Sequence, residues 1–441
     1  MKKIALSFLV FHLSFSPAGA QSQPWSLRQC CEYALEHNIS VKQRENQLRQ
    51  REVQLSTARN QRLPDLNVSA SQNFSFGRGL TADNTYTNKS TSSTSFSLGT
   101  SVPLFTGFRI PNTIAVNRLN LEAATVDLEK AKNDICMQVA QAYVQILYAM
   151  EVADVAQRQI DIDSAQVARI EALVKVGKAS EAQLSQQKAT LAQSQLTATQ
   201  AINSRQLALL TLSQLLELET PDDFTILRLE QKVDGVGQEL PTPDQIFADA
   251  MLVKPEIEAE RLRLQVAEKN ISLAKADLYP SLSFSAGMGS NYYKTSGFDA
   301  DPFATQMKNN FSQYLGFNLS IPVFSRFQTR NSIRSARIDR ENQLLSFDSA
   351  KKTLYKDIQQ VYYNTVAAQQ KLKSSEQACK SAADAFRLTQ AKYEQGKATI
   401  TEFNEQKNIY LKSESDLTQA RYEYLYQTAL ILFYRGKPLN F

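Results

Sequence analysis

The chain has 441 residues but contains little of the chemistry that enzymes use. It holds two histidines and four cysteines, and the cysteines, Cys30, Cys31, Cys136 and Cys379, show no CxxC spacing. Outside the first twenty residues the one histidine is His37. A zinc site or a His-based nucleophile site therefore has few residues from which to form. The composition predicts no enzyme, no metal and no cofactor.

Long apolar runs and a one-sided charge are also missing. Beyond residue 20 no stretch of 18 apolar residues occurs, and the mean hydropathy is −0.35, so no transmembrane helix is predicted. If the chain enters a membrane, it does so as strands. Its formal charge of +5 comes from acidic and basic residues that are mixed along the chain, which argues against a nucleic-acid partner.

The first twenty residues have the pattern of a secretory signal peptide. Lys2 and Lys3 form a positive start, residues 4–15 an apolar core, and Ala18-Gly19-Ala20 a small-residue cleavage site. The sequence therefore predicts export, with a mature chain that begins at Gln21.

Glycine and proline are absent from two very long stretches, Asn112–Val176 and Val323–Gln395. Small and apolar residues recur along the first stretch at helical spacing: Leu121, Ala124, Leu128, Ala131, Ile135, Val139, Ala142, Ile146, Ala149, Ala153, Ala156 and Ile160. We expect long helices over about 110–176 and 326–395. A helix of about 65 residues would be roughly 100 Å long at 1.5 Å per residue, which suits a coiled coil or a helical tube rather than a compact domain.

The chain is an internal duplication. Residues 34–70 align without a gap on 250–286 at a shift of 216, and beyond a variable loop the shift is 219. At this shift Tyr143 aligns with Tyr362, and Gly177 aligns with Gly396. The two glycines each lie at the predicted tip of a helical hairpin. We predict repeat 1 over 21–230 and repeat 2 over 231–441, joined by a linker with a short strand near 224–227.

Each repeat contains alternating segments typical of strands, over about 66–104 and 282–323. Apolar residues share one face and Ser, Gly, Asn and Gln occupy the other, as a lipid-facing barrel requires. A soluble sandwich is the alternative, but the chain offers no second sheet for packing. Four strands cannot close a barrel, for which about eight are the minimum, so the sheet and the helical tube must be shared between chains.

The order of helix, β-hairpin, long helix, glycine tip and return helix, repeated after a signal peptide, resembles the TolC-type outer-membrane efflux channel family. The resemblance covers nearly the whole mature chain. It implies a mainly α fold with membrane β-structure, in which a homotrimer forms a twelve-stranded barrel in outer-membrane lipid and a twelve-helix periplasmic tube. It also implies a periplasmic adaptor and an inner-membrane pump of RND or ABC type as partners.

Two groups of residues mark the predicted joints between strands and helices. The prolines are expected to end one hydrogen-bonding pattern before the next begins: Pro64, Pro103, Pro280 and Pro322. The aromatic residues either anchor the barrel rim at the lipid headgroups or pack between helices: Phe105, Phe108, Phe324 and Phe327.

The second predicted site lies at the tips. Glu402 and Glu405 share a helix face three residues apart, at spacings where family members carry acidic residues, and in a trimer they would form two rings that attract cations. The alternative is two glutamates on a wet surface. Tyr393 is a candidate lock of the closed tip. The candidate adaptor-docking residues are Val176, Gly177, Lys178, Ala179, Gly396, Lys397 and Ala398.

The cysteines leave two alternatives open. Cys136 and Cys379 are separated by about 24 residues along the duplicated rods, roughly 36 Å and too far for a disulfide. Cys136 either bonds to Cys30 or Cys31, or all are free thiols. For the whole chain, a structural periplasmic coiled-coil scaffold without a pore is the alternative to a channel, and the lipid-facing strands favour the channel.

Overall fold

The computed structural model describes residues 24–80, 84–219, 224–228 and 240–439, so the expected signal peptide lies outside the described residues. These residues form two compact units. The strand unit comprises Gln43–Ala131 and Lys254–Tyr355, and the hairpin unit comprises the described parts of Met1–Lys42, Lys132–Val253 and Lys356–Phe441. Both repeats contribute to each unit. Among the described helices, none has an apolar stretch long enough to span a bilayer.

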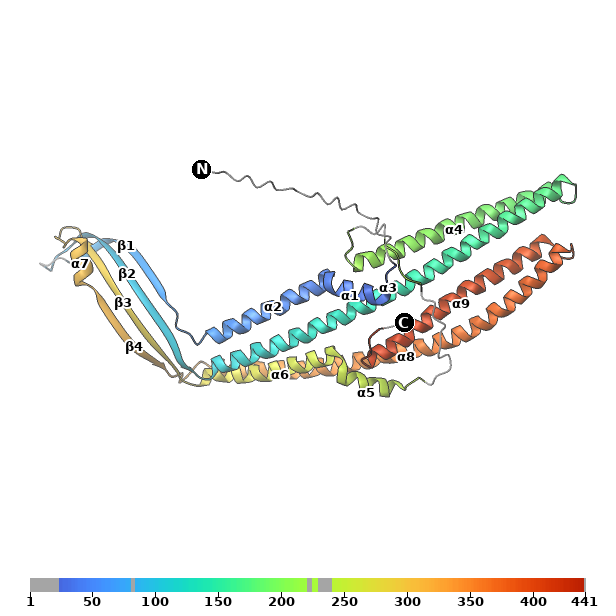
Figure 1. Ribbon diagram of the computed structural model, residues 1–441. Coiled ribbons are helices and arrows are strands. Elements are labelled where there is room, and N and C mark those ends of the chain that lie inside the picture. The colour runs from blue at the N-terminus through green and yellow to red at the C-terminus, as the bar shows by residue number, and fades with distance from the viewer. Residues whose placement is uncertain (1–23, 81–83, 220–223, 229–239, 440–441) are drawn as a thin grey trace, which may run out of the picture. The chain divides into compact units, whose positions relative to one another are not determined.

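The strand unit contains a four-stranded antiparallel sheet in the order β1-β2-β3-β4 (Figure 1). Its strands are β1 (Asn67–Leu80), β2 (Tyr86–Thr106), β3 (Ser281–Thr295) and β4 (Ser312–Ser320). Repeat 1 supplies β1 and β2, repeat 2 supplies β3 and β4, and the β2–β3 pairing joins the repeats. Among the strands that the structure describes, β1 and β4 are the outer two, so each has one edge that no other described strand pairs with.

The strands differ from the expected ranges at two places. β4 ends at Ser320, whereas the alternation predicted a strand to 323, because Pro322 has no N–H with which to continue the ladder. In β2 the pairing with β3 shifts between Pro103 and Phe105. This β-bulge places Phe105 opposite Leu282, on the apolar face, although strict alternation would put it on the polar face.

A short helix, α7 (Phe303–Asn309), interrupts the loop between β3 and β4, where the sequence predicts only a variable loop. It completes the hydrogen bonding of the part of β3 that β4 does not reach. The side chain of Gln306 binds the N–H and C=O of Tyr293 at 2.9 and 3.0 Å, and Asn310 donates to the carbonyl of Asn291 at 2.6 Å. The side chains of Gln306 and Asn310 thus bind backbone groups of β3 that would otherwise be unpaired.

Besides the sheet, the strand unit contains most of α2 (Ile39–Asn60), all of α6 (Pro255–Lys275), and the beginnings of α3 (Arg109–Lys175) and α8 (Gln328–Glu394). Leu55 and Ala58 of α2 form a buried cluster with Ile110 and Ile114 of α3. Pro111 lies in the first turn of α3, where its missing N–H costs no helical hydrogen bond.

Two helical hairpins dominate the hairpin unit (Figure 1). The first joins α3 to α4 (Glu181–Leu215), and the second joins α8 (Gln328–Glu394) to α9 (Ile400–Tyr434). Small side chains form a buried seam of the first hairpin: Ala153, Ala156, Ala198 and Ala201. Because alanine occupies so little space, the two helices can approach closely along this seam.

Two short helices, α1 (Leu27–His37) and α5 (Pro243–Val253), complete the hairpin unit. The expected strand near 224–227 is reduced to a single bridge between Ile226 and Trp25. Tyr143 of α3 is fully buried. Its hydroxyl donates to the carbonyl of Leu227 at 2.6 Å and also lies within hydrogen-bond distance of the carbonyl of Trp25, at 3.1 Å. One duplicated tyrosine therefore fastens this segment to the first long helix.

Candidate functional site

Both hairpins end in the same helix cap. Gly177 and Gly396 have φ values of +69° and +74°, the left-handed region that glycine adopts without strain. The N–H of Lys178 donates to the carbonyl of Leu173 at 2.8 Å, and Lys397 makes the equivalent bond in the second tip. This is the Schellman arrangement, which ends a helix within one turn.

The tips present small or flexible residues to solvent. Val176, Gly177, Lys178, Gly396 and Lys397 are exposed. The two alanines that follow, Ala179 and Ala398, are half-buried. A Cβ placed on either glycine would meet no atom within 4 Å, so the structure leaves open space beside both tips.

Glu402 has a structural role that the sequence analysis did not identify. Its carboxylate accepts hydrogen bonds from the backbone N–H of Thr399 at 2.7 Å and from the Thr399 hydroxyl at 3.0 Å, which completes a capping box at the start of α9. Gln183 does the same for Ser180 at the start of α4. The hydrogen bond from the Thr399 backbone lowers the pKa of Glu402, so its negative charge persists at mildly acidic pH.

Glu405 lies three residues further along α9, and both carboxylates are exposed. The two side chains are close in sequence on a single helix, which places them on neighbouring positions of one surface. The geometry shows two charges near a tip and one of them engaged in helix capping.

Tyr393 is held between the two hairpins. Its ring stacks on Phe403 of α9 with a centroid distance of 5.0 Å, and the guanidinium of Arg169, from α3, lies 4.8 Å from the ring centroid. This is a cation–π contact. Burial raises the pKa of Tyr393 above its ordinary value, so the phenol stays neutral. Arg169 was missed in the sequence analysis.

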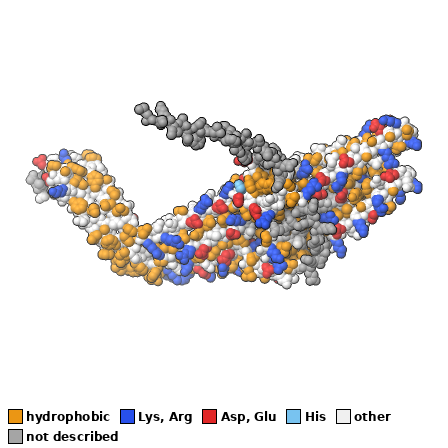
Figure 2. Space-filling model, in the orientation of Figure 1, with side chains coloured by type: hydrophobic (Ala, Val, Ile, Leu, Met, Phe, Trp, Pro, Cys, Tyr) orange, Lys and Arg blue, Asp and Glu red, His pale blue; other side chains and the backbone are white. Residues whose placement is uncertain are grey.

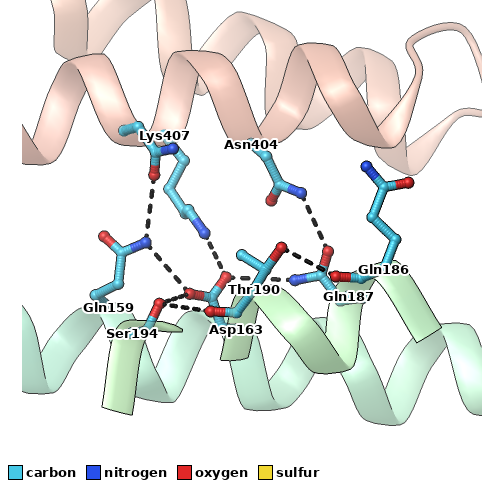
Figure 3. Close-up of polar contacts among 9 residues, drawn as sticks. Gln159, Asp163, Gln186, Gln187, Thr190, Ser194, Asn404 and Lys407 are labelled. Carbon is cyan, nitrogen blue, oxygen red and sulfur yellow. Dashed lines mark hydrogen bonds and ion pairs between the residues drawn. The ribbon is translucent and has the colours of Figure 1, made fainter. Parts of the chain in front are cut away.

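Above the tips, a buried ion pair joins the hairpins (Figure 3). Lys407 of α9 points toward Asp163 of α3 and contacts its Oδ1, and both side chains are fully buried. Ser194 and Gln187 of α4 lie beside the pair, so all three helices meet at one carboxylate.

The Asp163 carboxylate is saturated with donors. Besides Lys407, it accepts hydrogen bonds from Ser194 at 2.6 Å, Gln159 at 3.2 Å and Gln187 at 3.3 Å. Asn404 in turn donates to Gln187 at 3.1 Å. A charge in the interior is tolerated only with such partners, because burial removes its hydration.

This network was missed from the sequence, although each member leaves a trace. Lys407 falls between Phe403 and Leu411, on the buried face of α9. Asp163 follows Ile160 at helical spacing, on the apolar stripe of α3. A charged residue inside each of two apolar stripes is a signal for a buried pair, but it does not identify the partners.

The four prolines lie near strand ends in different ways. Pro64 lies between α2 and β1, Pro280 immediately precedes β3, and Pro322 follows β4 by two residues. Pro103 instead lies inside β2, at the bulge. The ladder between β1 and β2 begins at the Asn67–Gly99 pair, so Pro103 has no partner in β1. A residue without an N–H is accommodated at this place.

Aromatic rings cluster at the strand-to-helix junctions. Phe105 contacts Phe108 edge-to-face at 5.3 Å, and Phe324 contacts Phe327 in the same way at 5.5 Å. All four rings are exposed in the single chain. Phe108 and Phe327 adopt φ values of +69° and +61°, which is unfavourable for a bulky residue. Both repeats therefore place a phenylalanine in the same strained conformation at equivalent positions.

The sheet has one apolar and one polar face. Cross-strand pairs such as Leu98–Met288 and Phe284–Phe317 follow one another on the apolar face. The other face is lined by small polar pairs such as Ser69–Ser97. Figure 2 shows hydrophobic side chains gathered over the strands, whereas Lys, Arg, Asp and Glu are spread along the helices. The segments 67–77, 90–106, 281–293 and 312–320 contain no charged residue.

In this structure no disulfide links the four cysteines. The structure brings together Cys31 of α1 and Cys136 of α3, whose side chains are hydrogen-bonded. Cys30 is buried beside them, and burial raises its pKa to about 12. Among the described residues no group of three or more His, Cys, Asp and Glu side chains is arranged to hold a metal ion.

A duplicated helix and β-hairpin unit, with an apolar sheet face and two capped helical hairpins, defines the class of outer-membrane channel proteins built from tandem repeats. The family model for the outer membrane efflux protein matches residues 31–217 and 248–433. The chain belongs to this outer membrane efflux protein family, which is a family of channels rather than of enzymes.

Individual relatives are distant. The chain is 25% identical over 324 residues to the pyoverdine export outer membrane protein OpmQ of Pseudomonas putida, covering 72% of this chain and 64% of OpmQ. It is 28% identical over 167 residues to the outer membrane protein TolC of Vibrio cholerae, covering 38% of this chain and 37% of TolC. The chain thus spans less than two thirds of the length of these curated relatives.

The fold is shared over a greater length than the sequence. The crystal structure of the Campylobacter jejuni CmeC outer membrane channel superposes with a TM-score of 0.77 at 16% sequence identity, covering 93% of this chain and 85% of CmeC. The same succession of repeats therefore folds alike despite little sequence identity.

Proposed function

We propose that the chain is the outer-membrane channel of a tripartite export system. In this system it passively conducts substrates from a periplasmic adaptor and an inner-membrane pump of RND or ABC type to the exterior. One observation carries the proposal. Within one chain, a sheet whose segments 67–77, 90–106, 281–293 and 312–320 lack charge and share an apolar face continues through β2 into the long helix α3, whose hairpin ends in an exposed tip. The sheet suits lipid, and the hairpins suit water.

The working form of this channel is a homotrimer. β1 and β4 each leave one edge unpaired, and an open sheet edge in lipid exposes backbone groups that cost several kcal/mol each. Pairing of β4 with β1 of a second copy removes both edges when the ring closes. Three copies give a barrel of twelve strands, which is wide enough for a pore.

The exposed rings at the junctions anchor the barrel rim in this arrangement. Phe108 and Phe327 lie where strands pass into helices, the level at which aromatic residues favour lipid headgroups. Packing against helices is the alternative, and the exposure of all four phenylalanines in the chain favours the rim.

The tips are the periplasmic entrance and the docking site of the adaptor. Glu402 and Glu405 of three chains would line the entrance as acidic rings, and Tyr393 with Arg169 would hold the entrance closed. The open space beside Gly177 and Gly396 allows a helical hairpin of the adaptor to approach.

Conductance of the purified chain in a planar lipid bilayer tests the proposed pore. We expect discrete conductance steps, each from one trimer. The structural scaffold without a pore, the alternative function, predicts no steps from protein that is correctly folded by circular dichroism.

Adaptor docking is tested separately at the tip glycines. Gly177→Trp with Gly396→Trp should abolish export, because each indole fills the space that the adaptor needs. Gly177→Asn with Gly396→Asn is the matched control, since asparagine tolerates a positive φ and is much smaller. Trimers should persist in both variants. Equal export by the two variants would exclude docking at the tips.

A further inference from the structure

Two thiols face one another at a pocket in the hairpin unit. Cys31 of α1 and Cys136 of α3 both line this pocket of about 430 Å³, together with Leu35 and Phe433. The S–H of Cys31 donates a hydrogen bond to Sγ of Cys136. Neither thiol is required for the channel function proposed above.

The surrounding structure holds the two cysteines in place. At the end of α1, the side chain of Asn38 donates to the carbonyl of Leu215 at 3.0 Å. Before α1, Trp25 forms a backbone bridge with Ile226. Tyr143 follows Cys136 by two helical turns and binds the Trp25 carbonyl, so the face of α3 that carries Cys136 is fixed against the segment that leads into α1.

We propose that Cys31 and Cys136 form a disulfide bond in the exported protein and that this bond covalently ties α1 to α3. The mature chain folds on the oxidising side of the inner membrane, where adjacent thiols are oxidised rather than kept reduced. Closure of the bond encloses α2, β1 and β2 in one covalent loop, which restricts the unfolded chain.

The oxidant is the disulfide of a periplasmic thiol–disulfide oxidoreductase. The Cys136 thiolate attacks one sulfur of that disulfide, forming a mixed disulfide and releasing the other sulfur as a thiol. Cys31 then loses its proton and attacks Sγ of Cys136, and the remaining oxidoreductase sulfur leaves as a second thiol. The channel thiols lose two protons and two electrons in total, and the oxidoreductase disulfide is reduced to a dithiol.

The local chemistry supports this order and this pair. The hydrogen bond from Cys31 lowers the pKa of Cys136, which favours Cys136 as the attacking thiolate. Cys30 is fully buried, and burial disfavours its thiolate. The pocket is also lined by the exposed residues Arg28 and Glu32, so it opens to solvent.

Mass spectrometry of the full-length chain tests the bond. Cells are quenched with acid and N-ethylmaleimide before lysis, and the chain is digested without reductant. We expect a cross-linked peptide pair whose fragments join Cys31 to Cys136, two hydrogen masses below the sum of the separate peptides. Recovery of both cysteines as maleimide adducts, or a bond that joins Cys30 to Cys136, would overturn the proposal.

Variants provide a second readout on non-reducing gels. The denatured wild-type chain should migrate faster than the reduced chain, because the closed loop is more compact. Cys31→Ser and Cys136→Ser should each abolish this difference, whereas Cys379→Ser, on α8, should retain it. A difference that survives in Cys31→Ser would contradict the pairing, and channel conductance measured in parallel reports separately on pore formation.

Discussion

At the scale of single residues, the buried contact between Lys407 and Asp163 joins the two hairpins most directly. Lys407→Met would leave the Asp163 carboxylate buried without its cation, so we expect a loss of about 3–5 kcal/mol in stability. Lys412→Met, an exposed lysine on the same helix, should have little effect. The measurement is thermal unfolding of the purified chain by circular dichroism.

A double variant separates burial of charge from packing. Lys407→Met with Asp163→Leu removes both charges and should recover most of the stability lost in Lys407→Met, since apolar side chains of similar volume often replace a buried ion pair without cost. A double variant that is as unstable as the single one would show that Ser194 and Gln187 still depend on the carboxylate.

The carboxylates near the tip can be tested without disturbing the helix cap. Glu402→Gln keeps the capping box, because glutamine already fills that role at Gln183, and so removes only the charge. Together with Glu405→Gln it should weaken block of conductance by divalent cations. Glu405→Gln alone is the informative single variant. An unchanged blocking constant in the double variant would exclude the proposed acidic rings.

The same charge predicts a pH dependence. The folded pKa of Glu402 is lowered below its unfolded value, so the stabilisation by the ionised cap is complete above the unfolded pKa and is lost as the pH falls through the folded pKa. The same lowered pKa keeps Glu402 ionised in mild acid. Block by divalent cations should therefore persist in mild acid and disappear at lower pH in the wild type. In Glu402→Gln this late loss should be absent, as a titration of conductance would show.

At the scale of elements, the strand-to-helix junctions of the two repeats carry different residues in the same strained place. Gly107 and Arg326 both have positive φ, at +60° and +51°. Arg326→Gly should be neutral or stabilising by up to about 1 kcal/mol, because the relief of strain is partly offset by glycine's greater unfolded entropy. Gly107→Ala should destabilise more strongly, since its Cβ would lie 2.8 Å from Cβ of Tyr279 and would clash with the carbonyl of Ala276.

The heat needed to dissociate the purified oligomer on an unboiled gel measures both changes. Arg326→Ala is the control, because it removes the side chain but retains the strain. Equal dissociation temperatures for Arg326→Gly and Arg326→Ala would mean that the positive φ stores no appreciable energy at this junction.

The elements also show which features the sequence could predict. The helices follow from stretches without glycine or proline, and the β-hairpins follow from alternation, because both signals are local. The bulge after Pro103 leaves no mark in composition, and α7 is too short for a periodic pattern. The pairing of Lys407 with Asp163 depends on how α9 and α3 are aligned in space, which neither helix specifies alone.

At the scale of the whole molecule, the two faces of the sheet predict opposite tolerance of charge. Leu315 on the apolar face of β4 is 78% exposed in the single chain, whereas Asn318, on the same strand, lies on the polar face opposite Ser283. Leu315→Lys would place a cation in lipid, at a cost of about 2–4 kcal/mol per chain near the bilayer midplane. Asn318→Lys would place the same charge in a water-filled lumen.

We therefore expect Leu315→Lys to reduce the amount of assembled channel in outer membranes and Asn318→Lys to leave the amount unchanged while altering ion selectivity. Immunoblots of membrane fractions and native mass spectrometry in detergent measure the amount and the number of chains, which should be three. In the proposed trimer the Leu315→Lys penalty would occur three times in one barrel, so its effect should exceed that of one misplaced charge. Equal assembly of the two variants, or a monomer in detergent, would contradict a shared barrel with lipid on its apolar face.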